Sequence, residues 1–503
     1  MLAEVVSYWY SRLWSQLWTP KPRSILRKQL DRATSYQEHE EIAMALDTMM
    51  GNDLWRQNPI DSGFDYKLIS ERLTQLYDAR MAGDQLKIAN ILRASVVRNI
   101  GSISGKAMFT RSYAGTKILI EDYIDEVVRC IHALYSLPTT DKFDAQARHD
   151  LLSAIRRSLG RTVLVLQGGS VFGTCHLGVL RGLYQQDLLP RIIAGSGFGA
   201  LVAALVAATP DLSAFFSTLP MYYEYFLGEK EIPLSERFSA DRVKRILRDL
   251  ASASSTNSKS SLMRLVKRCL GDMTFEEAFI LTERTLNIVV YTDNPNVPSL
   301  FNYVRTPNVV IWSAAAASIS EGSQLDIRFK KIDGSISKPH ERWDAIPDED
   351  KPVTTLPWVS VSSTAKVQPY MAMTALFNVN HFIISQTHPY VAPFLLTDLR
   401  KYAHVNTWYN KLTRLAVLEL NHRLRQIDFF GLLPQTLKRV LVDEPFPGVE
   451  ITTVPDIHAG DATHLFDAPS KELLEYWMLK GERSIWHALP LIRTRCLVEV
   501  ALD

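Results

Sequence analysis

Two glycine-rich turns lie close together in the middle of the chain, and each has residue types that could serve chemistry. The first is Gly168-Gly169-Ser170-Val171-Phe172-Gly173, and the second is Gly195-Ser196-Gly197-Phe198-Gly199. A glycine-rich loop at a helix start presents unpaired backbone N–H groups to an anion. A Gly-x-Ser-x-Gly elbow between a strand and a helix holds a nucleophilic serine in a tight turn. Together, two such turns would supply an oxyanion-binding loop and a nucleophile position.

The segments around these turns predict the elements that must position them. Residues 163–166 and 192–194 are short apolar runs typical of buried strands. A helical pattern begins at about His176 after the first turn, and residues 200–208 form an apolar helical pattern after the second. Strand, glycine turn and helix, repeated in this order, predict an α/β core with a parallel sheet.

The rest of the chain predicts further helices and strands around that core. Residues 30–150 show apolar positions at helical spacing and predict a layer of helices. Thr274 and Glu277 match a capping box at a helix start. Residues 286–292 and 309–312 are predicted strands, and residues 486–502 are predicted to form a closing helix.

Composition bounds the class of protein. The chain has 503 residues, 47% of them hydrophobic, which predicts two or three domains with large cores. A net charge of +2 does not favour nucleic acid as a partner. The four cysteines form no CxxC pair, so we expect buried thiols in a reducing, intracellular compartment. The sequence disfavours a simple transmembrane span and a secretory signal.

Residues 1–19 have the pattern of an amphipathic helix with an aromatic-rich face. A basic cluster follows it after Pro20. Trp and Tyr prefer a membrane interface, and nearby cations favour anionic headgroups, so we expect a helix on a lipid surface. The alternative is that this helix docks into a groove of its own protein. Its apolar positions are Leu2, Val5, Val6, Trp9, Tyr10, Leu13, Trp14, Leu17 and Trp18.

In order and spacing, the two turns resemble the patatin-like phospholipases. The resemblance is to the fungal and plant branch of triacylglycerol lipases and lysophospholipid acyltransferases, and it extends from about residue 30 to residue 503. It implies a three-layer α/β/α core with a mainly parallel sheet, preceded by a helical domain. It also implies a Ser-Asp dyad without His, with the Ser on the elbow and the Asp in a later Asp-Gly turn, and no cofactor.

At the elbow, this sequence departs from the family pattern. Ungapped alignment puts Gly195 and Gly199 at the flanking glycines, so Gly197 occupies the nucleophile position and offers no hydroxyl. Shifting the frame by one residue would nominate Ser196, but Phe198 then occupies a place that needs a small residue. The resemblance assigns the oxyanion loop to Gly168, Gly169, Ser170, Val171 and Gly173.

The base position also departs from the family pattern. Residues 376–386 resemble the strand that follows the family's Asp-Gly-Ser turn, and counting back from it puts Val361 where the Asp would be. Asp333-Gly334 lies well upstream between short alternating segments, a pattern typical of a hairpin turn. The alternative is that Asp333 is a displaced base. We interpret His176 and His381 as structural, because neither has a Cys or His nearby at metal-ligand spacing.

These observations predict four regions. Residues 1–28 form the membrane-surface helix and a basic linker, and residues 29–158 a helical domain. Residues 159–400 form the patatin-like domain, and residues 401–503 a C-terminal extension packed on it.

The resemblance implies a lipid acyl-hydrolase, whereas Gly197 and Val361 predict a pseudoenzyme. Such a chain would bind acyl lipids, or regulate an active patatin-like relative, as a peripheral protein of the endoplasmic reticulum membrane or of a lipid droplet. One alternative is an active hydrolase that uses Ser196 or Asp333. Another is a purely structural partner whose cavity has collapsed.

Overall fold

The computed structural model describes most of the chain. Several predictions concern residues outside this part: the amphipathic helix over residues 1–19, the loop positions Gly169 and Ser170, and the base position Val361. The described residues are 22–136, 143–168, 171–227, 266–290, 299–319, 327–331, 333–337, 363–387, 447–456 and 470–503, with the single positions 415, 419, 422, 423, 426 and 461.

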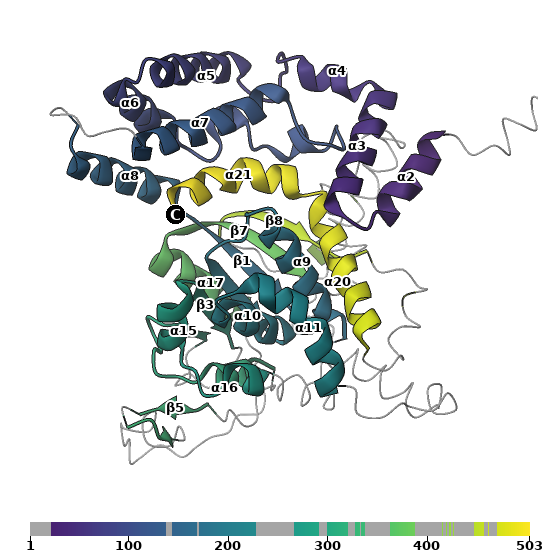
Figure 1. Ribbon diagram of the computed structural model, residues 1–503, viewed down its shortest axis with the longest axis vertical. Coiled ribbons are helices and arrows are strands. Elements are labelled where there is room, and N and C mark those ends of the chain that lie inside the picture. Colours follow the sequence, from purple (N-terminus) through teal and green to yellow (C-terminus); the bar gives the residue numbers. More distant parts are fainter. Residues whose placement is uncertain are drawn as a thin grey trace, which may run out of the picture.

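A six-stranded sheet forms the centre of the molecule (Figure 1). Its strand order is β4-β3-β2-β1-β7-β8, and all neighbouring strands are parallel except β3 and β4. The sequences of parallel strands are nearly continuous apolar runs because helices cover both faces of the sheet. The prediction of a mainly parallel α/β core is therefore confirmed. The strands are β1 Arg161–Gln167, β2 Ile192–Ser196, β3 Thr285–Val289, β4 Leu300–Phe301, β7 Val379–Gln386 and β8 Val449–Thr453.

The two faces of the sheet bury different sets of side chains. Successive residues of a strand point to opposite faces. Leu164 and Ile193 belong to the larger core with α10, whereas Val163 and Ile192 belong to a smaller core that includes Tyr370 of α17. The helices around the sheet are α9 Cys175–Tyr184, α10 Phe198–Ala208, α11 Leu212–Leu227, α15 Phe275–Thr282, α16 Ile311–Ile319, α17 Ser363–Phe377 and α20 Lys471–Trp486, with the 3-10 turn η3 Val171–Thr174.

The helical pattern predicted over residues 30–150 is present and forms a layer above the sheet. The side chains of Ser35, Asp84 and Asp144 cap α3, α6 and α8 by accepting backbone N–H groups. Helix α21 Leu489–Leu502 lies between this layer and the sheet (Figure 1). The layer comprises α2 Pro22–Arg32, α3 Tyr36–Met50, α4 Asn52–Gln57, α5 Tyr66–Met81, α6 Gln85–Ser95, α7 Ile118–Ser136 and α8 Ala145–Leu159, with 3-10 turns η1 Ile100–Ser102 and η2 Lys106–Phe109.

Two local motifs form as predicted. Thr274 caps α15, and the Glu277 side chain accepts the Thr274 N–H in return, so the capping box is complete. Asp333 and Gly334 lie in the turn between the antiparallel strands β5 Phe329–Lys330 and β6 Ile336–Ser337. Gly334 has φ +81°, a conformation that glycine adopts without steric cost.

The prediction of a strand over residues 309–312 is wrong. Within the described residues, Val309 and Val310 form only single bridges, with Phe329 and Thr274 respectively, and Ile311 begins helix α16. The alanine-rich run that follows has high helix propensity, so the β-branched residues at its start do not extend into a strand. Helix α10 begins at Phe198, two residues before its predicted start.

Two further predictions need correction. The predicted closing helix over residues 486–502 is two helices, because Trp486 ends α20 and α21 begins at Leu489 with a proline in its first turn. Cys269 is exposed, whereas the other three cysteines are buried as predicted. Val266 and Leu270, one helical turn apart, face the core, so Cys269 lies on the outer side. Among the described residues, no helix is long and apolar enough to cross a membrane.

Candidate active site

The second glycine turn is a one-residue elbow between β2 and α10. Strand β2 ends at Ser196, helix α10 begins at Phe198, and Gly197 alone connects them. Gly197 has φ +59° and ψ −127°, in the region that disfavours side chains with a Cβ. The elbow stands at the carboxyl edge of the parallel strands, where α/β proteins place ligands and reactive groups.

The three glycines of the elbow have different steric surroundings. A Cβ added at Gly195 would lie 2.5 Å from the carbonyl O of Gly199, and one added at Gly199 would overlap the carbonyl of Leu166. Among the described residues, a Cβ at Gly197 would meet no closer neighbour than the Cα of Gly168, at 3.9 Å. The turn therefore requires glycine at its flanks and has room for a side chain at position 197.

The first glycine turn packs directly on the elbow. The carbonyl O of Gly168 accepts the Gly199 N–H with an N to O distance of 3.2 Å. A Cβ at Gly173 would overlap the ring of Phe198, the first residue of α10. Val171 begins the 3-10 turn η3, which leads into α9. The two turns that the sequence singles out thus lie together at one edge of the sheet.

Ser196 does not occupy the turn. It is the last residue of β2 and is 6% exposed. Strand alternation puts its side chain on the same face as Ala194, which packs in the core beneath α17. Its register partner on β1 is Gln167, whose Nε2 donates to the hydroxyl of Tyr370 at 3.2 Å.

Asp333 lies on a hairpin separate from the six-stranded sheet. Its Oδ1 accepts both the backbone N–H and the hydroxyl of Ser335, at 2.9 and 2.6 Å. These hydrogen bonds, first the one from the Ser335 hydroxyl, lower the pKa of the exposed carboxyl. A lower pKa makes a carboxylate a weaker general base. Val361 itself lies outside the described residues, and α17 begins shortly after it, at Ser363.

The two histidines in the motifs are fully buried in hydrogen-bond networks. His176 bridges two hydroxyls near the end of β7, with Nδ1 2.9 Å from Oγ of Ser385 and Nε2 3.4 Å from Oγ1 of Thr387. His381 lies at the opposite edge of the sheet, with Nδ1 3.2 Å from Oγ1 of Thr162. Burial lowers the pKa of His381 well below its ordinary value, and the nearby charges of Arg98 and Arg495 lower it further.

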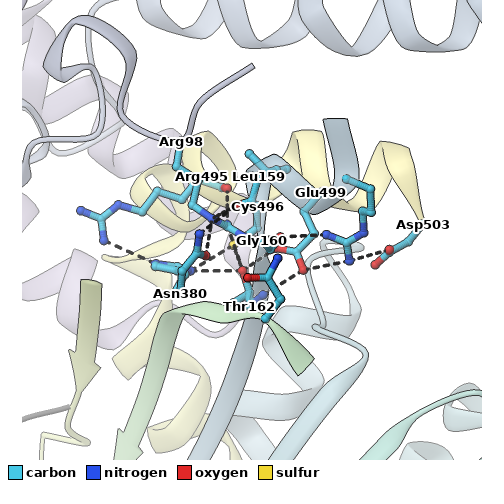
Figure 2. A network of polar contacts seen from close by, with 12 residues as sticks. Arg98, Leu159, Gly160, Thr162, Asn380, Arg495, Cys496, Glu499 and Asp503 are labelled. Atoms are coloured by element: carbon cyan, nitrogen blue, oxygen red, sulfur yellow. Dashed lines mark hydrogen bonds and ion pairs between the residues drawn. The ribbon is translucent and has the colours of Figure 1, made fainter. Parts of the chain in front are cut away.

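A charged network that the sequence alone does not indicate surrounds His381. Figure 2 shows Arg98 and Glu499 meeting Thr162 where β1 begins. Arg98 reaches Oε2 of Glu499 at 2.7 Å, and Glu499 also accepts the backbone N–H and the hydroxyl of Thr162. Burial raises the pKa of Glu499, but Arg98 and these hydrogen bonds outweigh it, so the pKa is lowered. This network lies at the amino edge of the strands, away from the elbow.

Fold and site together define an α/β protein with a mainly parallel sheet and a strand–glycine–helix elbow at its carboxyl edge. The patatin-like phospholipase family matches residues 164–324, and a domain family of unknown function, DUF3336, matches residues 16–157. The chain belongs to the patatin-like phospholipase family, within the triacylglycerol lipases of fungi and plants that act in lipid metabolism.

Three relatives illustrate this likeness. Triacylglycerol lipase ptl1 of Schizosaccharomyces pombe is 33% identical over 477 residues, which cover 93% of this chain and 82% of the relative. Triacylglycerol lipase 3 of Saccharomyces cerevisiae is 27% identical, covering 100% of this chain and 92% of the relative. Triacylglycerol lipase SDP1L of Arabidopsis thaliana is 29% identical, covering 96% of this chain and 58% of the relative.

Proposed function

We propose that this chain has lost the covalent chemistry of its family and retains the binding of acyl lipids. The observation that carries the proposal is Gly197 in the elbow turn. A covalent mechanism needs a nucleophile at that point, and glycine offers only hydrogen. Removing the nucleophile of a serine hydrolase reduces kcat by about six powers of ten, so any remaining turnover should be very slow.

The two candidate substitutes are poorly placed for the same role. Ser196 is buried on the strand and faces the core beneath α17, where an ester would not reach it. Asp333 is held by Ser335 on a separate hairpin, and its lowered pKa weakens it as a base. These observations favour loss of hydrolysis over an active enzyme that uses either residue.

The proposal places this binding at a lipid surface. The aromatic-rich pattern of residues 1–19 and the basic cluster after it favour a peripheral site on the endoplasmic reticulum membrane or on a lipid droplet. There the chain would bind acyl lipid and regulate an active patatin-like relative. Deleting residues 1–19 should abolish flotation with lipid droplets or anionic vesicles, and unchanged flotation would contradict this surface.

Hydrolysis assays on the full chain test the loss of chemistry. We expect no measurable release of fatty acid from triacylglycerol emulsions or lysophospholipid micelles, and activity in the variant Gly197→Ser/Val361→Asp. The matched control is Gly197→Ala/Val361→Asp, which adds the same Cβ at the same positive φ but no hydroxyl.

Binding is measured on the same preparations, by coflotation of the unmodified chain with the buoyant triacylglycerol emulsion and by its coelution with the lysophospholipid micelles. We expect the unmodified chain to bind without hydrolysing. Hydrolysis by the unmodified chain that Ser196→Ala removes would overturn the proposal in favour of an active enzyme. Failure to bind either lipid would indicate a purely structural partner.

A further inference from the structure

A serine from another helix holds the elbow. Ser318, in the last turn of α16, accepts the backbone N–H of Gly197 through Oγ, with an N to O distance of 2.9 Å. The same Oγ donates to the carbonyl O of Val289, at 2.6 Å. A hydroxyl has one proton to donate and two lone pairs to accept with, so both hydrogen bonds can form together.

This hydroxyl lies where the pairing of β2 with β3 ends. Ser196 and Val289 are partners at the last step of that pairing. Gly197 follows Ser196, but the chain turns into α10 there, so its N–H cannot continue the ladder. A half-buried backbone N–H needs another acceptor, and the Ser318 hydroxyl is that acceptor. The hydroxyl is held in turn by its own hydrogen bond to the Val289 carbonyl on the neighbouring strand β3.

A backbone in a sparsely populated conformation persists only where its surroundings impose it. The close packing of Gly195 and Gly199 folds the chain back on itself, but it does not orient the peptide that enters Gly197. In the described part of the chain, Ser318 supplies the side-chain hydrogen bond to Gly197. We call the two hydrogen bonds of Ser318, to the Gly197 N–H and to the Val289 carbonyl, the clamp. The clamp does not depend on the side chain at position 197, because it acts on the backbone.

We propose that Ser318 is the positioning residue of the elbow: its hydroxyl fixes the orientation of residue 197, whichever side chain that residue carries. The inference rests on the proposed function in one respect, since it takes Gly197 as the nucleophile position. It adds the residue that maintains the backbone conformation at position 197 in the absence of a serine hydroxyl there. A serine introduced at position 197 would then be presented by the same clamp.

Helix α16 contains a matched control for this clamp. Ser313 is also a serine whose hydroxyl makes two hydrogen bonds, donating to the carbonyl O of Val310 at 2.7 Å and accepting the N–H of Arg328 at 3.0 Å. Neither partner belongs to the elbow. Ser313→Ala and Ser318→Ala therefore remove the same group from the same helix, and only Ser318→Ala releases Gly197.

Hydrogen–deuterium exchange of the full chain tests the clamp without requiring activity or lipid binding. A hydrogen bond of average strength corresponds to about fivefold protection, so Ser318→Ala should raise the exchange rate of the Gly197 amide about fivefold, measured in peptides that contain residues 195–199. Ser313→Ala should leave that peptide unchanged, and Ser318→Thr, which keeps a hydroxyl, should restore protection. Unchanged exchange at the elbow in Ser318→Ala, or an equal rise in Ser313→Ala, would overturn the proposal.

A second readout follows the position of the introduced serine. In the Gly197→Ser/Val361→Asp background, Ser318→Ala should lower the rate of labelling by a fluorophosphonate about tenfold, because misplacing a reacting group slows its attack. Ser313→Ala should not lower it. If the double variant is not labelled at all, that result counts against the proposed function, and the exchange measurement still decides the clamp.

Discussion

A methyl group at Gly199 would overlap the carbonyl of Leu166, whereas one at Gly197 would lie 3.9 Å from its nearest neighbour in the described part of the chain. Close packing of the turn thus requires glycine at the flanking residues, whereas at position 197 it is the positive φ, and not packing against the described residues, that disfavours a side chain. A hydroxyl at position 197 would be part of the chemistry and would not be needed by the fold. This is why the elbow can keep its shape with glycine in the place of a nucleophile.

Another single residue, His39, gives the fold a dependence on pH. Its side chain is 4% exposed, and its Nε2 has no hydrogen-bond partner among the described residues. Its ring packs against Trp486 and His487 at centroid distances of 5.5 and 5.0 Å. Burial lowers its pKa from 6.5 to about 4. Between these two values the unfolded chain binds the proton and the folded chain does not.

Stability should therefore fall as pH drops from 6.5 towards 4, by about 3 kcal/mol in all from this group. The contribution is fully present above pH 6.5. His39→Phe, which keeps a ring and cannot be protonated, should reduce the difference between the free energies of unfolding in urea at pH 6.5 and at pH 5. His149→Gln, at an exposed histidine of α8, is the control and should keep the wild-type slope. An identical slope in His39→Phe and in the wild type would contradict this account.

At the scale of elements, the crossing of α9 and α20 depends on glycines that let the two backbones touch. A Cβ at Gly178 of α9 would overlap the carbonyl O of Met478, and one at Gly481 of α20 would overlap the carbonyl O of Cys175. Because α9 follows the first glycine turn, this crossing fixes the position of the helix that leads out of that turn. Glycine costs helix stability in isolation, so tertiary packing decides these positions.

Gly178→Ala should therefore destabilise the protein by about 1–3 kcal/mol, since backbone atoms cannot move aside as a flexible side chain can. The matched control is Gly182→Ala in the same helix, where the nearest atom to an added Cβ is Cγ2 of Ile485, at 3.0 Å. There the gain in helix propensity, about 1 kcal/mol, should offset the crowding. Urea unfolding of both variants measures the difference. Equal destabilisation of both would indicate that helix α9 does not need close contact at Gly178.

At the scale of the whole molecule, the sequence predicts those strands, helices and turns that residues close together along the chain determine. The strands around the elbow and the Asp333-Gly334 turn follow from local patterns, and both are present. The strand predicted over residues 309–312 fails because the alanines after it favour a helix. Ser318 and Gly197 are 121 residues apart, and Arg98 and Glu499 are 401 apart, so no local pattern links them. These contacts exist only once the fold has brought distant segments together.

The longest of these links joins the helical layer, the sheet and the last helix (Figure 2). Arg98 follows α6, Arg156 belongs to α8, and both pair with Glu499 of α21, at 2.7 and 3.3 Å. The side chain of Glu499 is 8% exposed, and those of Arg98 and Arg156 are 10% and 15% exposed. Removing one partner of a buried pair leaves charge without compensation, which is far more destabilising than losing a surface pair.

Glu499→Ala should therefore lower the free energy of unfolding by about 3–5 kcal/mol, because Arg98 loses its carboxylate and the Thr162 N–H its acceptor together, whereas Arg156 keeps Asp503 at 2.7 Å. The same helix supplies the control. Arg493 pairs with Asp125 at 3.5 Å, but their side chains are 60% and 37% exposed, so Arg493→Ala should change stability by less than about 1 kcal/mol. Urea unfolding measures both. If the two variants lost equal stability, the network around Glu499 would be no more than a set of surface ion pairs, and the helical layer would be held to the sheet by apolar packing alone.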